Sequence, residues 1–210
     1  METTSFPKVD LRYGKNRLRK IGIAIVSLFL ITLSGVILFK KRPCTMVMPE
    51  WIQQELIKVD GAARRGTKLE KVTAIAVHYV GNPNTTAMQN RNYFNQQGVS
   101  VSSHFIVGLE GEVVQCVPID EISSATNHRN RDTISIEVCH PDASGQFSEK
   151  TYASLVRLVT WLCRELELDQ TDLLRHYDVT GKLCPLYYVK NPQEWERFCD
   201  EIGRNLAEKS

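Results

Sequence analysis

The feature that most constrains this chain is an uncharged apolar segment near its N-terminus. Residues 21–39 read IGIAIVSLFLITLSGVILF, nineteen residues that would form a helix nearly as long as a bilayer core is thick. A buried core helix of this length usually has a polar face, and a signal peptide has a shorter apolar core followed by a small-residue cleavage site. Residues 38–44, LFKKRPC, offer no such site. The sequence therefore favours an uncleaved transmembrane anchor over either alternative.

Charge predicts the orientation of this anchor. The tail over residues 1–20 carries a net charge of +4, whereas the opposite flank has only Lys40, Lys41 and Arg42. Because the more basic flank stays in the cytoplasm, we expect a single-pass protein of the cell membrane with a cytoplasmic N-terminus and an exported remainder. Subtracting both flanks from the whole-chain charge of +2 leaves −5 for residues 43–210, which argues against a nucleic-acid partner.

The exported part divides into a linker and one domain of ordinary size. Residues 40–60 indicate a juxtamembrane linker with a short helix around residues 51–57, and residues 61–208 indicate the domain. The six cysteines of the chain lack the spacing of a disulfide framework, and their pairing stays open. Cys139 and Cys163 fall in apolar patterns, so we expect them to be small core residues.

Strand and helix patterns alternate through the domain. Residues 72–80, VTAIAVHYV, predict a strand buried on both faces, and residues 133–140, TISIEVCH, predict another. The stretch SSHFIVGLEGEVVQCVP predicts two strands joined by a tight turn in which Gly111 supplies a positive φ. Helices are predicted after NPNTT, after Ser148 and after Asn191–Pro192. The alternation predicts an α/β fold with a mixed central sheet flanked by helices.

The segment RHYDVTGKLCP, residues 175–185, indicates half of a metal site. Seven residues including Gly181 separate His176 from Cys184, so a segment that folds back could bring both to one ion. Catalytic zinc takes three protein ligands and leaves one position for water. His78 is the candidate third ligand because it follows small alanines on a predicted strand, although an isolated histidine there is more often a hydrogen-bonded core residue.

Glu137 favours the metal site over the core histidine. It lies between Ile136 and Val138 on a strand expected to be buried, where an ionised carboxylate is costly unless it is paired or close to a metal. A general base beside a catalytic zinc ion explains such a carboxylate. Lys182, two residues before Cys184, is expected at the rim of the site, where its ammonium group can stabilise an oxyanion.

Four motifs, in this order, carry a family resemblance: AIAVHYVGNP, SSHFIVGLEG, ISIEVCHPD and RHYDVTGKLCP. Over roughly residues 51–206 the chain resembles the zinc-dependent N-acetylmuramoyl-L-alanine amidases of the type-2 amidase family, relatives of the peptidoglycan-recognition proteins. The resemblance implies that residues 61–208 are a zinc amidase domain. It implies Zn²⁺ as the cofactor, peptidoglycan or muropeptides as the substrate, and hydrolysis of the amide bond between N-acetylmuramic acid and L-alanine.

The resemblance also implies roles for single residues. The three zinc ligands correspond to His78, His176 and Cys184, and the catalytic pair corresponds to Glu137 and Lys182. Phage-type and animal members have a catalytic tyrosine directly before the HF motif, where this chain has Ser103. The resemblance to the bacterial branch therefore assigns that role to Glu137, and the histidine of the HF motif, His104, is expected to pack in the core.

Two other classes of function compete with the enzyme. A peptidoglycan-recognition module without activity typically lacks a metal ligand, whereas this chain has all three candidates together with Glu137 and Lys182. A membrane-attached interaction domain with structural zinc would need a fourth protein ligand, and no residue at a sensible spacing supplies one. The sequence favours the enzyme.

The predicted transmembrane anchor leads to a first testable prediction. The full-length chain should be recovered in the membrane fraction of the cells that produce it, because residues 21–39 insert into the bilayer. Fractionation followed by immunoblotting measures this. Release of the chain into the medium would contradict the prediction.

Overall fold

The computed structural model describes residues 46–59 and 61–208, and one compact unit begins at Val47. The predicted tail and anchor, residues 1–39, lie outside the described residues. Within the described part, no helix is both long enough and apolar enough to cross a bilayer.

The centre of the unit is one mixed sheet. Its strands are β1 (Ile52–Gln54), β2 (Ala74–Val77), β3 (Phe105–Val107), β4 (Val113–Gln115), β5 (Thr133–Val138) and β6 (Leu173–Arg175). They lie in the order β1–β4–β3–β5–β2–β6. Neighbouring strands run parallel except β3 and β4, which form the antiparallel hairpin that the sequence predicts.

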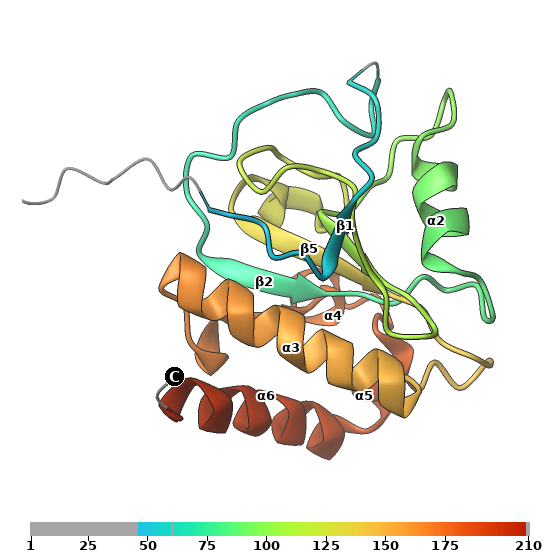
Figure 1. Cartoon of the computed structure of the whole chain (residues 1–210). Helices are drawn as coiled ribbons and strands as arrows, with labels where there is room; N and C mark the ends of the chain where they lie inside the picture. Colours follow the sequence, from blue (N-terminus) through green and yellow to red (C-terminus); the bar gives the residue numbers. More distant parts are fainter. Residues whose placement is uncertain (1–45, 60, 209–210) are drawn as a thin grey trace, which may run out of the picture. The chain divides into compact units, whose positions relative to one another are not determined.

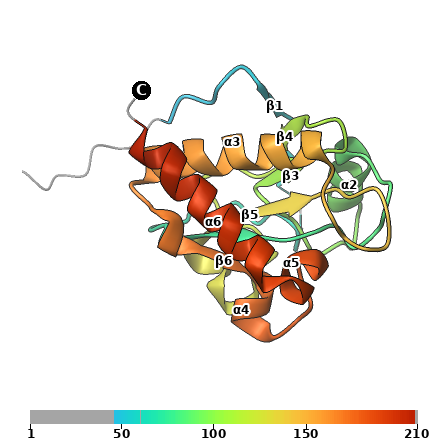
Figure 2. The same ribbon diagram turned by 90° about the horizontal axis from the view of Figure 1, so that it is seen from below.

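Helices cover both faces of this sheet (Figures 1 and 2). They are α2 (Ala87–Phe94), α3 (Glu149–Leu166), α4 (His176–Thr180), α5 (Leu186–Lys190) and α6 (Pro192–Ala207), with 3₁₀ helices η1 (Asn127–Arg131) and η2 (Gln170–Asp172). The long helices α3 and α6 pack together over one face, and α2 lies over the other. The predicted α/β architecture is confirmed.

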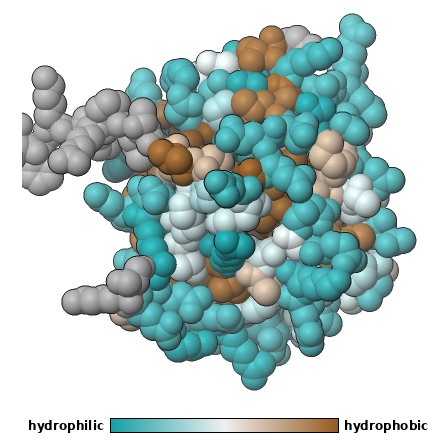
Figure 3. Space-filling model, in the orientation of Figure 1, coloured by the Kyte–Doolittle hydropathy of each residue, from teal (hydrophilic) through white to brown (hydrophobic). Residues whose placement is uncertain are grey.

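Each face of the sheet buries its own core. Ile75 and Val77 of β2 join Leu158 of α3 and Phe198 of α6 in the larger cluster, and Phe94 of α2 belongs to the smaller one. All four residues of β2 are buried, as expected for a strand covered on both faces. Hydrophilic residues predominate on the face in Figure 3, where apolar ones show in small separate groups. Most of the large apolar side chains within the described residues are buried or packed against the two cores.

The turn between β3 and β4 requires a glycine, as predicted. Gly111 has a φ of +87°, which L-residues rarely adopt. A Cβ atom at this position would lie 2.7 Å from Ser154 Oγ, so both the backbone conformation and the available space exclude a side chain.

The predicted helix starts are present, although one cap differs. The Ser148 side chain accepts a hydrogen bond from the Thr151 N–H and caps α3. Asn191 precedes α6, but its side chain does not cap that helix. Instead its Nδ2 donates to the Tyr187 carbonyl at 2.9 Å.

The short helix predicted around residues 51–57 is wrong. Residues 52–54 form β1, which pairs in parallel with β4 at the edge of the sheet. The Ile57 N–H then donates to the Cys116 carbonyl at 2.9 Å, which continues the contact beyond the strand. Pairing with a segment sixty residues away overrides the local helical pattern, because tertiary contacts outweigh weak propensities.

The cysteines within the described residues are thiols. They are Cys116, Cys139, Cys163, Cys184 and Cys199. Cys139 and Cys163 are fully buried, which confirms their prediction as core residues.

The larger core can be tested by truncating Leu158, which is fully buried. Leu158→Ala should lower the free energy of unfolding by about 2–5 kcal/mol, because it removes buried methyl groups and leaves a cavity. Chemical denaturation measures the loss. Leu56→Ala is the matched control, since Leu56 is 38% exposed and its truncation should cost well under about 1 kcal/mol. Equal losses in both variants would contradict the assignment of the core.

Candidate metal centre

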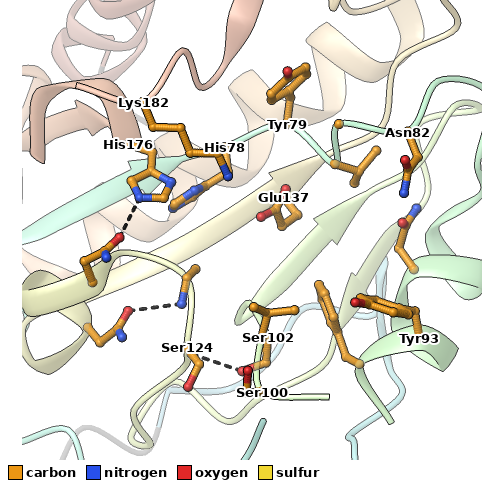
Figure 4. A pocket seen from close by; sticks show the side chains of 18 residues that line it. His78, Tyr79, Asn82, Tyr93, Ser100, Ser102, Ser124, Glu137, His176 and Lys182 are labelled. Atoms are coloured by element: carbon orange, nitrogen blue, oxygen red, sulfur yellow. Dashed lines mark hydrogen bonds between the residues drawn. The ribbon is translucent and has the colours of Figure 1, made fainter. Parts of the chain in front are cut away.

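The register of three parallel strands places three of the predicted site residues in a row. Val77 of β2 pairs with Arg175 of β6 on one side and with Ile136 of β5 on the other. The residues that follow these three are His78, His176 and Glu137. Their side chains face a common space near the carboxyl ends of the strands (Figure 4).

Cys184 reaches this row because residues 176–184 fold back on themselves. The short helix α4 ends at Thr180, and the next residue, Gly181, turns the chain with a φ of +77°. The Tyr177 N–H then donates to the Cys184 carbonyl at 3.0 Å and closes the segment. As a result, Cys184 Sγ lies 3.8 Å from Nδ1 of His78. The fold-back agrees with the sequence analysis, which did not predict β6 or α4.

His78, His176 and Cys184 form a group able to hold one metal ion. Their ligating atoms all lie within 4.8 Å of one another, and all three residues are buried. Around one tetrahedral zinc ion the ligand atoms lie roughly 3.3–3.8 Å apart, so a small side-chain movement completes the geometry. Imidazole and thiolate are preferred zinc ligands, and three of them leave one position open. The donor set therefore fits a catalytic zinc ion.

Burial favours the neutral forms of these three ligands. It lowers the pKa of His78 to about 3, together with the smaller effects of the charges of His176 and Lys182. Burial, followed by the charge of Lys182, also lowers the pKa of His176. Burial, followed by the charge of Glu137, raises the pKa of Cys184 to about 12. Neutral imidazole is already the metal-binding form, whereas Cys184 has to release its proton when a metal binds.

Glu137 is the carboxylic acid of the site. Burial raises the pKa of Glu137 to about 8, against the opposing effect of the Lys182 ammonium group. Within the described residues, its Oε2 atom is buried and has no hydrogen-bond partner. A carboxyl group with a pKa close to neutrality and a free oxygen can accept a proton and later return it.

The site opens onto a cleft of about 560 Å³. His78, His176 and Glu137 form part of its wall, and Lys182 lies beside the two histidines (Figure 4). Much of the remaining wall consists of uncharged polar side chains, which are Asn82, Asn90, Tyr93, Ser100, Ser102 and Ser124. The cleft therefore connects the candidate metal centre to groups able to hydrogen-bond a neutral polar ligand.

Comparison with known proteins identifies the family. The N-acetylmuramoyl-L-alanine amidase family matches residues 68–186, more than half of the chain. The chain belongs to this family. It is 27% identical over 176 residues to the N-acetylmuramoyl-L-alanine amidase CwlL of Bacillus licheniformis, covering 76% of this chain and 48% of that relative. With BlyA of Bacillus subtilis (strain 168) it shares 29% identity over 175 residues, covering 73% and 47%. The chain spans about half the length of these curated relatives.

Solved structures share the fold with this amidase-family chain. A mutant endolysin from Bacillus subtilis superposes with a TM-score of 0.64 at 28% identity, over 72% of this chain and 98% of that one. The Staphylococcus aureus hydrolase AmiA, solved with its ligand, has a TM-score of 0.59 at 16% identity, over 77% and 85%, and shows the fold alone. The family resemblance and the mixed α/β fold expected from the sequence are confirmed.

Ser103, at the position where other family branches have a tyrosine, does not face the cleft. It is fully buried, and its Oγ donates to the Phe105 carbonyl at 2.8 Å. Its hydroxyl is thus engaged by the backbone of β3. This placement agrees with the expectation that Ser103 has no catalytic role.

His104 is a hydrogen-bonded core residue, as expected. The Ser135 N–H donates to its Nδ1 at 2.9 Å, so Nε2 carries the ring proton and donates to the Glu121 carbonyl at 2.8 Å. Burial lowers the pKa of His104 to about 4. Protonation of Nδ1 of His104 would also break the hydrogen bond that this atom accepts from the Ser135 N–H.

Two residues that were not predicted from the sequence contact the candidate ligands. Thr126 Oγ1 lies 3.1 Å from Nε2 of His78. Asn127 Oδ1 lies 2.7 Å from Nε2 of His176, a bond drawn as a dashed line in Figure 4. Their only signal in the sequence is the polar run TNHRN, which is typical of any loop.

The buried state of His104 predicts a pH-dependent stability. As the pH falls from about 6.5 to about 4, His104 should reduce the free energy of unfolding by roughly 3 kcal/mol, because the unfolded chain takes up a proton that the folded chain does not. Above about pH 6.5, the contribution of neutral His104 to the free energy of unfolding is present in full. Denaturant unfolding at a series of pH values, with chelator present, measures it.

The comparison is with His104→Gln, which cannot titrate at this position. Between about pH 6.5 and about pH 4, this variant should lose roughly 3 kcal/mol less stability than the parent protein. His128→Gln is the control because His128 is exposed, and its curve should run parallel to that of the parent protein. A parallel curve for His104→Gln would refute the assignment.

Proposed function

We propose that the compact unit that begins at Val47 is a zinc-dependent amidase that hydrolyses the amide bond between N-acetylmuramic acid and L-alanine of peptidoglycan. The curated relatives CwlL and BlyA are named N-acetylmuramoyl-L-alanine amidases, and the chain belongs to their family. The chain matches about half of their length, so the proposal concerns the activity of this domain.

One observation carries the proposal: a group of three zinc-type ligands and a free carboxyl oxygen lie beside an open cleft whose wall includes His78, His176 and Glu137. The ligands are the buried group His78, His176 and Cys184. The oxygen is Oε2 of Glu137, one residue beyond the pairing of β5 with β2. A Lewis acid and a general base together can add water to the carbonyl of an unactivated amide, and this arrangement can hold both.

The side chains then divide the reaction between them. His78, His176 and Cys184 would hold a zinc ion, which would supply Lewis-acid chemistry at a carbonyl and at water. Glu137 accepts a proton from water as the water oxygen bonds to the lactyl carbonyl carbon. Glu137 then gives that proton to the alanine nitrogen as the C–N bond breaks. The products are the muramic-acid carboxylate and a peptide with a free N-terminal alanine.

Lys182 stabilises the negative charge that develops on the carbonyl oxygen. Its ammonium group lies beside the two histidines at the cleft and acts electrostatically on Glu137 (Figure 4). A positive charge fixed where an oxyanion forms lowers the barrier of acyl transfer. The uncharged polar wall of the cleft suits a substrate composed of an N-acetylated sugar and peptide bonds.

Two observations disfavour the competing classes. A binding module without activity does not need a buried carboxyl group with an unpartnered oxygen, since such a group costs stability. Structural zinc usually takes four protein ligands, whereas the candidate group found within residues 46–59 and 61–208 has three.

We further propose that residues 21–39 hold this domain at the outer face of the cell membrane. The support is the uncharged length of the segment and the excess of positive charge over residues 1–20. An amidase tethered in this way would act on the peptidoglycan nearest the membrane.

The reaction is tested on the purified full-length chain with muropeptides, and the products are weighed by mass spectrometry. The chain should release stem peptide with N-terminal alanine, lose the activity with chelator and regain it with zinc. Glu137→Gln should bind zinc as well as the parent protein but turn over about 10²–10⁴-fold more slowly, because it cannot accept the proton.

Glu110→Gln is the matched control, since Glu110 forms only an exposed ion pair with Lys150 and should leave turnover unchanged. Full activity in Glu137→Gln would remove the general base from the mechanism. Binding of muropeptides without cleavage, with zinc supplied, would move the protein to the recognition class.

A further inference from the structure

The two candidate histidine ligands are both hydrogen-bonded to one turn of the chain. Nε2 of His78 lies 3.1 Å from the Thr126 hydroxyl, and Nε2 of His176 lies 2.7 Å from the Asn127 amide oxygen. Thr126 and Asn127 are consecutive, whereas the two histidines are almost a hundred residues apart. A single turn thus contacts both rings on the side opposite their Nδ1 atoms.

These bonds decide which ring nitrogen can hold a metal. An amide oxygen only accepts hydrogen bonds, so Nε2 of His176 carries the proton and Nδ1 keeps its lone pair. The Thr126 hydroxyl can accept in the same way from Nε2 of His78. The Nδ1 atom of His78 then faces Cys184 Sγ at 3.8 Å. Both rings are therefore oriented with Nδ1 available to the candidate metal centre.

The turn that carries Thr126 and Asn127 is itself held in place. The Asn130 side-chain oxygen accepts the backbone N–H groups of Ala125 at 3.0 Å and Thr126 at 2.5 Å. Asn127 has a φ of +55°, a left-handed conformation that asparagine tolerates better than most residues. Thr126 is fully buried, so its hydroxyl is shielded from competing water.

A second set of bonds fastens the turn to the sheet. In η1, which begins at Asn127, the Arg129 side chain pairs with Asp132 at 2.9 Å. The same guanidinium group donates to the Thr73 hydroxyl at 3.2 Å, just before β2 begins. The turn is thus tied to β2, the strand that directly precedes His78, and its distance from both rings is set by the fold.

We propose that Thr126 and Asn127 are positioning residues that hold His78 and His176 in the Nε2–H tautomer with Nδ1 directed at the metal. This inference rests on the proposed function, since it assigns both histidines to zinc. Hydrogen bonds of this kind fix ring orientation and raise the basicity of the ligating nitrogen.

Four variants of the full-length chain test the roles separately. Asn127→Gly removes the acceptor without straining the left-handed backbone, and Asn127→Asp keeps an acceptor oxygen. Thr126→Val removes the hydroxyl at nearly constant volume, and Thr126→Ser keeps it. Asn84→Gly and Thr160→Val are the matched controls: Asn84 is exposed with a φ of +60°, and Thr160 is buried on α3 with an unpartnered hydroxyl.

The first measurement is zinc affinity by competition with a chromophoric chelator. Asn127→Gly and Thr126→Val should each weaken zinc binding by about 10- to 100-fold. Asn127→Asp and Thr126→Ser should stay close to the parent affinity, as should both controls. Parent-like zinc affinity in Asn127→Gly and Thr126→Val would overturn the inference, while failure of the parent chain itself to bind zinc would overturn the proposed function.

The second measurement reads the tautomers directly in the metal-free protein. Long-range ¹H–¹⁵N correlation spectra of the chain with ¹⁵N-labelled histidine should show His176 protonated at Nε2 in the parent protein. Asn127→Gly should give a mixture of tautomers at His176, and Asn84→Gly should not. An unchanged His176 tautomer in Asn127→Gly would refute the positioning role whether or not zinc binds.

Discussion

Parallel pairing of β6, β2 and β5 is the constraint on which the site depends. Because Val77 stands opposite both Arg175 and Ile136, the next residue of each strand falls in one row across the sheet. A shift of any strand by one residue would turn its site residue to the opposite face. The packing of α3 and α6 on one face and of α2 on the other holds this register.

The fold tolerates a cluster of polar groups in its interior because nearly every one has a partner. His78 and His176 are bonded through Nε2 to Thr126 and Asn127, and His104 is bonded through both ring nitrogens. Oε2 of Glu137 is an exception, since it is buried without a hydrogen bond inside the described part of the chain. A buried oxygen without a hydrogen bond lowers the stability of the fold. At the wall of the cleft, the same oxygen is available to accept a proton.

Local sequence patterns predicted the helices, strands and turns that depend mainly on residues adjacent in the sequence. The apolar run at residues 72–80 indicated β2, Ser148 indicated the start of α3, and Gly111 indicated the turn between β3 and β4. The same reasoning failed at residues 51–57, where pairing with β4 outweighs the helical pattern. It also missed β6, because three residues are too few to show a periodicity.

The sequence by itself determined the family and the residues that make up the site, because those residues lie in motifs that can be recognised without the structure. They are His78, Glu137, His176, Lys182 and Cys184. Only the tertiary structure decided how His78, His176 and Cys184 converge, since their proximity depends on strand register and on the Tyr177–Cys184 hydrogen bond. The contacts of Thr126 and Asn127 with the rings were likewise invisible, because a polar loop carries no signal of which distant side chains it will meet.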